Sequence, residues 1–139
     1  YGCVERYIGA NYLVKQVVGQ IRRKEHTMLT GMVVNDLKKI TPELITEAAN
    51  RGDKLAQQVW QSMGKNLGII LASVINFLNP EMVVFTGGIS GAKKFFLPAL
   101  EETIKKRAFP EIRKKVKLVI SEKSLGVIGA ALLTQNTDI

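Results

Sequence analysis

The chain has 139 residues, of which 46% are hydrophobic and 23% are charged, and its formal net charge is +8. This length allows one domain with a core, and the hydrophobic content argues against a disordered chain. The 4 prolines and 12 glycines are scattered rather than clustered, which argues against a linker or a fibre. The positive charge could favour phosphate-bearing partners or nucleic acid. Because lysine and arginine recur along the whole chain beside acidic neighbours, we favour the solvated surface of a basic protein.

The sequence gives no sign of a membrane span or of secretion. Its most hydrophobic stretch, 67–78, is shorter than the roughly 20 residues of a span and contains Ser73 and Asn76, so it predicts a buried helix end. The single cysteine, Cys3, cannot form an internal disulfide, so a cytoplasmic location is the simplest. The chain starts at Tyr1 without a signal-peptide pattern, which suggests a cut inside a longer protein.

The first predicted element is a helix from Val4 to Lys24, because apolar residues recur there at helical intervals and basic residues close it. The segment 26–39 could be a short helix or a strand. The single histidine, His26, has no cysteine or histidine at metal-ligand spacing and no nucleophile beside it. We interpret it as a surface or loop residue.

Two further helices are predicted with clear ends. Thr41 can cap a helix, and it is followed by a proline and a glutamate that suit the first turn. Gly52 can adopt the left-handed conformation that ends a helix, so this helix should end near Arg51. Asp53 can cap the next helix, which makes 52–53 a tight junction between two helices.

The longest predicted helix runs from about Lys54 to Leu78. Gly64, Gly68 and Ala72 recur every four residues beside its apolar stripe. Because a glycine inside a helix costs up to about 1 kcal/mol, we expect another backbone to approach closely there, from a strand or a bound ligand. The stripe itself consists of Leu55, Val59, Met63, Leu67, Ile70, Leu71, Val74 and Leu78.

The last third of the chain predicts strands alternating with helices. Pro80 ends the long helix, and 82–85 is the continuous apolar run of a strand covered on both faces. A helix over 94–107, a second strand over 116–120 and a packed helix over 126–133 follow. Because two strands make a poor sheet, the missing strands should lie upstream. The fold class is therefore α/β, rich in helices and with few strands. The inward residues of the helix 94–107 are expected to be Phe96, Leu100, Thr103 and Ile104.

The segment 86–90, Thr-Gly-Gly-Ile-Ser, is the strongest local indication of a ligand site. It joins a buried strand to a helix, and in open α/β sheets ligands bind beyond the C-terminal ends of strands. Glycines let the backbone approach a ligand, and a helix N-terminus offers N–H groups to an anion. The alternative is a tight turn without a ligand. The segment is neither a Walker A loop nor a dinucleotide fingerprint.

Other candidate residues are weaker when taken alone. The Glu5 carboxylate could accept hydrogen bonds from ligand hydroxyls, and the Cys3 thiolate could bind a metal. One cysteine does not make a zinc site, so a free thiol and a helix-start carboxylate are the simpler interpretation. The basic clusters 105–107 and 113–115 have only Phe109 as an aromatic companion. They indicate a solvated edge rather than a surface that stacks bases.

Four segments together resemble the ROK family of sugar kinases and sugar-responsive repressors. Segment 2–7 resembles the end of the family's zinc motif, Cys-x-Cys-Gly-x-x-Gly-Cys-x-Glu, and 52–56 resembles its Gly-Asp-x-x-Ala junction. Segment 67–90 looks like its long helix, Asn-Pro-Glu turn and Gly-Gly nucleotide loop. Segment 125–131 resembles its closing helix. The match runs in register over nearly the whole chain.

The resemblance implies a two-lobed, actin-like (ribonuclease H-like) ATPase fold, with residues 1–139 as its C-terminal, nucleotide-facing lobe. By position, Glu5 would bind sugar hydroxyls, and Cys3 would be one zinc ligand in the intact protein. The expected nucleotide-binding residues are Gly87, Gly88, Ile89 and Ser90.

The resemblance also implies a function. It favours an ATP-dependent hexose kinase, and among these a glucokinase. Such an enzyme uses Mg-ATP and a hexose or N-acetylhexosamine, forms a homodimer when intact and binds no membrane. The alternative is the sugar-sensing lobe of a ROK repressor. The family's other zinc ligands, phosphate loop and catalytic aspartate precede this motif. We therefore expect this chain alone to bind no structural zinc and to phosphorylate no sugar. A third alternative, a basic nucleic-acid module, predicts salt-dependent DNA binding.

Overall fold

The computed structural model describes residues 3–34 and 36–121. The predicted helix over 126–133 and the matched segment 125–131 lie outside the described residues. Before the first strand come α1 (Glu5–Ile8), α2 (Ala10–Arg22), α3 (Leu29–Met32), the 3₁₀ turn η1 (Leu37–Lys39), α4 (Pro42–Asn50) and α5 (Lys54–Leu78). Then follow β1 (Met82–Phe85), the 3₁₀ turn η2 (Gly88–Ala92), α6 (Lys93–Arg107), α7 (Pro110–Arg113) and β2 (Lys117–Ile120).

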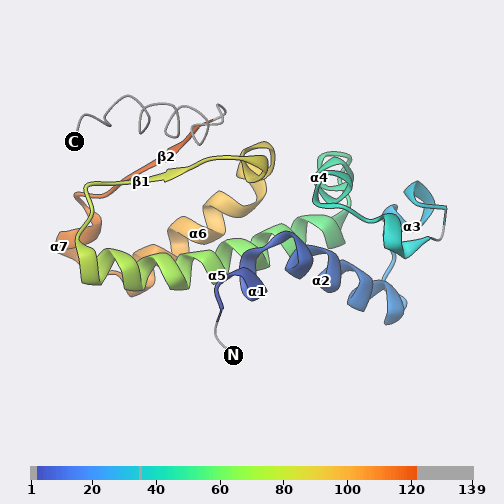
Figure 1. The fold of residues 1–139 in the computed structure, drawn as a ribbon, viewed down its shortest axis with the longest axis horizontal. Helices are drawn as coiled ribbons and strands as arrows, with labels where there is room; N and C mark the ends of the chain where they lie inside the picture. The colour runs from blue at the N-terminus through green and yellow to red at the C-terminus, as the bar shows by residue number, and fades with distance from the viewer. Residues whose placement is uncertain (1–2, 35, 122–139) are drawn as a thin grey trace, which may run out of the picture.

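The elements after residue 53 form three layers. Strands β1 and β2 pair in parallel, with Met82 opposite Lys117 and Phe85 opposite Ile120. Helix α6 connects them and lies between the sheet and the long helix α5 (Figure 1). Its Phe96 ring is 6.3 Å from the Phe85 ring on one side and 6.3 Å from the Trp60 ring on the other. This aromatic chain ties the sheet, α6 and α5 into one core.

The ends of α4 and α5 are those that the sequence predicts. The Leu44 N–H donates to the Thr41 hydroxyl at 3.4 Å, and Gly52 has a φ of +93° just after α4. The Ala56 N–H donates to Asp53 Oδ1 at 2.9 Å at the start of α5. Asn79 ends α5 in the left-handed conformation, at a φ of +46°. Capping chemistry therefore sets both boundaries.

The N-terminal prediction of one helix over 4–24 is wrong. Gly9 is extended, with a ψ of 171°, and it separates α1 from α2. A β-carbon at Gly9 would collide with the Glu5 carboxylate and would lie 2.6 Å from the Glu5 carbonyl oxygen. The break therefore forms at a residue without a side chain, and it creates space for Glu5.

The C-terminal end of α5 and the strand β1 are less buried than the apolar pattern indicates. Leu78 is 64% exposed, although it belongs to the predicted stripe. Met82 and Val84 are 50% and 44% exposed, so the prediction of a strand covered on both faces is wrong. An apolar run alone does not show which of its side chains a neighbouring element covers.

The glycines of α5 face another helix. A β-carbon at Gly64 would overlap the carbonyl oxygen of Phe96, and one at Gly68 would lie 2.9 Å from the carbonyl oxygen of Leu100. Both carbonyls belong to α6, so the expected close approach is confirmed, but its partner is a helix rather than a strand or a ligand. Within the described ranges, no helix is both long enough and apolar enough to cross a membrane.

Candidate ligand-binding site

A cavity of about 340 Å³ lies where α1, α2, α4, α5 and η2 meet. Its size falls within the range of small-molecule sites, and its lining is mostly apolar with a few polar groups, as such sites usually are. Glu5 lines it from α1, and Gly88 and Ile89 line it from η2. The cavity thus brings together the predicted sugar-binding residue and part of the predicted nucleotide loop, which are far apart in the sequence.

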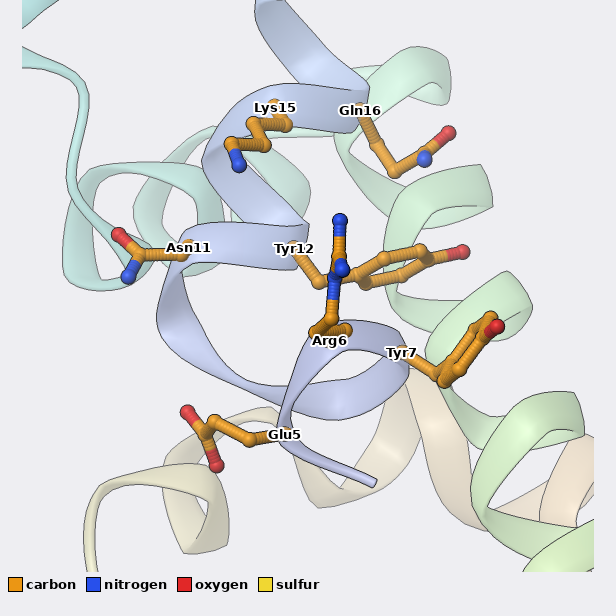
Figure 2. A pocket seen from close by; sticks show the side chains of 7 residues that line it. All are labelled: Glu5, Arg6, Tyr7, Asn11, Tyr12, Lys15 and Gln16. Carbon is orange, nitrogen blue, oxygen red and sulfur yellow. The ribbon is translucent and has the colours of Figure 1, made fainter. Parts of the chain in front are cut away.

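Glu5 is the first residue of α1, and its position depends on the turn that follows. Its carboxylate occupies the space beside Gly9, which also lines the cavity. Figure 2 shows the Glu5 carboxylate turned away from the Arg6 guanidinium on the same helix. No ion pair involves Glu5 among the residues that the structure describes, so its oxygens are available to hydrogen-bond donors.

The predicted nucleotide loop has open space beside its glycines. Gly87 has a φ of +88°, which favours glycine, and a β-carbon at Gly87 or Gly88 would meet no heavy atom of the described residues within 4 Å. Gly88 and Ile89 reach the cavity, whereas Gly87 is not among its lining residues. Ser90 lies within η2. The sequence indicates that a helix N-terminus follows the segment 86–90. In the structure η2 lies between Gly87 and α6, so the N-terminus of α6 does not follow the glycines directly.

The described residues do not form a zinc site around Cys3. Its thiol is exposed and free. Across the described ranges, no group of three or more histidine, cysteine, aspartate or glutamate side chains could hold a metal ion. His26 is exposed in a loop, as expected. Cys3 could therefore serve as a zinc ligand only together with residues that these ranges do not contain.

The sequence analysis missed the contribution of α4. Glu43 and Thr46, from its first turns, line the cavity that Glu5 lines. The Thr46 hydroxyl donates to the Pro42 carbonyl at 2.8 Å, within the helix. A hydrogen bond from the Thr41 side chain, and then one from the Glu43 backbone N–H, hold the pKa of the Glu43 carboxyl below its usual value. The helix-start pattern located Glu43, but no local signal indicated that α4 packs beside Glu5.

A second, more polar cavity of about 450 Å³ lies on the outer side of α1 and α2. Glu5 borders it as well, but no residue of η2 does. Its other lining residues, labelled in Figure 2, are Arg6, Tyr7, Asn11, Tyr12, Lys15 and Gln16. Because residues of the predicted nucleotide loop line only the first of these two cavities, the first is the better candidate.

The basic clusters at the C-terminal ends of α6 and α7 are partly paired. Lys106 forms an ion pair with Glu102 at 2.6 Å, and Lys114 forms one with Glu111 at 3.2 Å. The Arg113 guanidinium donates to the carbonyl oxygen of Lys105. These contacts suit a solvated surface on which acidic neighbours balance part of the charge.

The family model described as ROK matches residues 1–137. The chain belongs to the ROK family. It is 34% identical over 122 residues to the N-acetylglucosamine repressor of Escherichia coli, covering 88% of this chain and 29% of the repressor. It is 26% identical over 132 residues to the glucokinase of Thermotoga maritima, covering 94% of this chain and 41% of the glucokinase. This ROK chain thus spans less than half the length of these relatives.

Solved structures confirm the fold. A ROK family transcriptional regulator, a homologue of the E. coli Mlc protein, superimposes with a TM-score of 0.82 at 34% identity, over 97% of this chain and 33% of the regulator. The Streptomyces griseus ROK glucokinase in complex with glucose and AMPPNP gives a TM-score of 0.82 at 23% identity, over 95% of this chain and 44% of the enzyme. The chain therefore has the actin-like ATPase fold of ROK proteins, here rich in helices with a small parallel sheet.

Proposed function

We propose that residues 1–139 form the C-terminal, nucleotide-facing lobe of an ATP-dependent ROK hexose kinase. Among hexose kinases, we favour a glucokinase. The observation that carries this proposal is the single cavity lined by Glu5, Gly88 and Ile89. It lets a sugar held by a carboxylate lie beside a nucleotide held by an open glycine backbone. Phosphoryl transfer depends mainly on such positioning and on electrostatic stabilisation.

In this proposal, different residues bind the sugar and the nucleotide. Glu5 accepts hydrogen bonds from sugar hydroxyls, and the backbone of 87–90 lies along the nucleotide. Mg-ATP supplies the transferable phosphoryl group when it is bound. The catalytic base belongs, in the family pattern, to the upstream lobe. Cys3 would complete a structural zinc site there, and the intact protein would be a cytoplasmic homodimer.

Hexose-dependent ADP production by the native full-length protein tests the proposal. We expect glucose or an N-acetylhexosamine to raise the rate of ADP release from Mg-ATP above the rate without sugar. Glu5→Gln should raise KM for the sugar about tenfold or more, because the loss of a hydrogen bond between a hydroxyl and a charged group is of that order. If none of the sugars raises the rate of ADP release, the protein is not a kinase of these sugars.

The second candidate is the sugar-sensing lobe of a ROK repressor. It is supported by the 34% identity to the N-acetylglucosamine repressor, compared with 26% to the Thermotoga glucokinase. In this case the native protein would bind a sugar without hydrolysing ATP, and sugar binding would release the protein from operator DNA. Measuring ADP release and DNA release on the same preparation separates the two functions.

A further inference from the structure

A second carboxylate lines the candidate cavity, and the proposed sugar contact of Glu5 does not account for it. Glu43 reaches the cavity from the first turn of α4, whereas Glu5 reaches it from α1. No lysine or arginine is among the described residues that line the cavity. Glu43 also forms no ion pair among the described residues. Both glutamates therefore line the cavity, and no described cation lines it with them.

This pair of carboxylates selects the kind of ligand that can lie between them. Because the Thr41 side chain and the Glu43 backbone N–H lower its pKa, Glu43 is ionised at neutral pH and can only accept hydrogen bonds. Two negative charges disfavour a phosphate group at this point. They favour a neutral ligand that carries several O–H donors.

The other walls fit a ring with hydroxyl groups better than a hydrated ion. Trp60, Met63 and Leu67 give the cavity an apolar wall that can contact the C–H face of a ring. The Trp60 indole Nε1 is buried and has no hydrogen-bond partner in the described part of the chain, so a ring oxygen can reach it only if neighbouring side chains move. Mg²⁺ instead requires six oxygens and keeps several waters, which an apolar wall does not suit.

We propose that Glu43 is a second hydroxyl-binding residue, so that the cavity takes the vicinal hydroxyls of a neutral ring. The proposal rests on the proposed function in assigning Glu5 to the same ligand. Two rings carry this chemistry, the hexose and the ribose of the nucleotide. In either case α4, which the family pattern of motifs does not include, becomes part of the binding site.

Calorimetric titration of the native full-length protein with glucose, N-acetylglucosamine and adenosine, each alone, identifies the ring. Glu43→Gln should weaken the binding of one ring about tenfold, the usual effect of losing a hydrogen bond to a charged acceptor. Glu47→Gln is the matched control, because Glu47 lies one turn further along α4, pairs with Arg51 and does not line the cavity. It should leave all affinities unchanged.

Monodeoxy analogues of the ring that responds separate binding from a structural effect. If Glu43 contacts a hydroxyl, Glu43→Gln weakens the parent ligand but not the analogue that lacks this hydroxyl. The proposal is overturned if Glu43→Gln weakens the binding of every analogue equally, or if it weakens the binding of none of the rings. Binding of Mg²⁺ alone that Glu43→Gln abolishes would also overturn it in favour of a cation site.

The same titrations distinguish this proposal from the proposed function. If Glu5→Gln weakens sugar binding and Glu43→Gln does not, the sugar site stands and the role of Glu43 is refuted. If the native protein binds neither a hexose nor adenosine, both proposals fail. Circular dichroism of each variant shows whether it is folded before its affinity is compared.

Discussion

Glu5 and Gly9 depend on each other although they lie on either side of a helix break. The Glu5 carboxylate takes the space that any side chain at Gly9 would need, and the Gly9 N–H donates to the Glu5 carbonyl at 2.9 Å. The glycine therefore does two things at once. It ends α1, and it lets the carboxylate stay beside the cavity.

We predict that Gly9→Ala lowers sugar affinity about as much as Glu5→Gln does. The new methyl group must displace the Glu5 carboxylate, so the hydrogen bonds to sugar hydroxyls are lost and Kd rises about tenfold. Titration calorimetry with glucose or N-acetylglucosamine measures the change. Gly19→Ala is the control, because a β-carbon at Gly19 in α2 meets no heavy atom within 4 Å. Native affinity in Gly9→Ala would contradict this account of the turn.

Asp53 shows which part of a residue's role can be predicted from sequence. The helix-start pattern predicts its cap, and its Oδ1 does accept the Ala56 N–H. Its Oδ2 accepts two more hydrogen bonds, from the Thr27 hydroxyl and the Met28 N–H, both at 2.7 Å. Those donors lie in the segment 26–39, whose pattern was ambiguous. Local capping was therefore predictable, whereas the anchoring of a distant loop was not.

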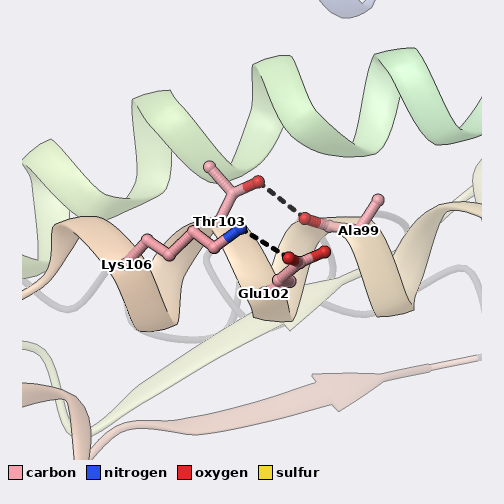
Figure 3. A network of polar contacts seen from close by, with 4 residues as sticks. All are labelled: Ala99, Glu102, Thr103 and Lys106. Carbon is pink, nitrogen blue, oxygen red and sulfur yellow. Dashed lines mark hydrogen bonds and ion pairs between the residues drawn. The ribbon is translucent and has the colours of Figure 1, made fainter.

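At the scale of elements, the contact between α5 and α6 is the most extensive one in the described core. Figure 3 shows Thr103 of α6 facing α5, with its hydroxyl donating to the Ala99 carbonyl at 2.7 Å. This internal hydrogen bond leaves the rest of the side chain to pack against Gly68, where an added β-carbon would lie 2.7 Å from Thr103 Cβ. The glycine spacing predicted a close neighbour. It could not identify the neighbour, since an approaching strand, helix or ligand needs the same empty space.

We predict that Gly64→Ala destabilises the protein, although alanine is the better helix former. Its β-carbon would overlap the carbonyl oxygen of Phe96, and backbone cannot move aside as a flexible side chain can. Overpacking of this kind costs about 1–3 kcal/mol of unfolding free energy, which exceeds the gain in helix propensity of up to about 1 kcal/mol. Urea denaturation followed by circular dichroism measures the difference.

Ser73→Ala provides the control for that measurement. Ser73 lies on the same helix but is exposed, and its hydroxyl donates only to the Ile69 carbonyl of its own helix. We expect its unfolding free energy to stay within about 0.5 kcal/mol of the native value. If Gly64→Ala instead stabilises the protein, α5 and α6 do not lie as close as the structure places them.

At the scale of the whole molecule, the sequence indicated the fold class but not the arrangement of the site. The junction at 52–53, the long helix, the strand–helix–strand order that follows it and the ROK resemblance were readable from caps, apolar runs and motifs. The cavity was not, because it forms where α1, α4 and η2 meet after folding. Glu43 is the clearest case, since its own segment reads as an ordinary helix start.

The net charge of +8 also acts at this scale. Lys15, Lys54 and Lys65 lie on α2 and α5, whereas the two basic clusters lie at the C-terminal ends of α6 and α7. In the described part of the chain these charges come from several helices, and Lys106 and Lys114 are paired with Glu102 and Glu111, which argues against one stripe that follows a phosphate backbone.

We therefore predict that the 139-residue chain does not retard duplex DNA at an ionic strength of about 150 mM, where non-specific contacts are weak. Gel retardation between about 50 and 200 mM salt measures this, with free lysine-rich peptide of equal net charge as the positive control. Retardation that persists at the highest salt would support the nucleic-acid module instead. Both ROK candidates are compatible with the expected result, because the repressor alternative assigns DNA binding to a separate segment. The ADP and operator-release measurements on the native protein then decide between them.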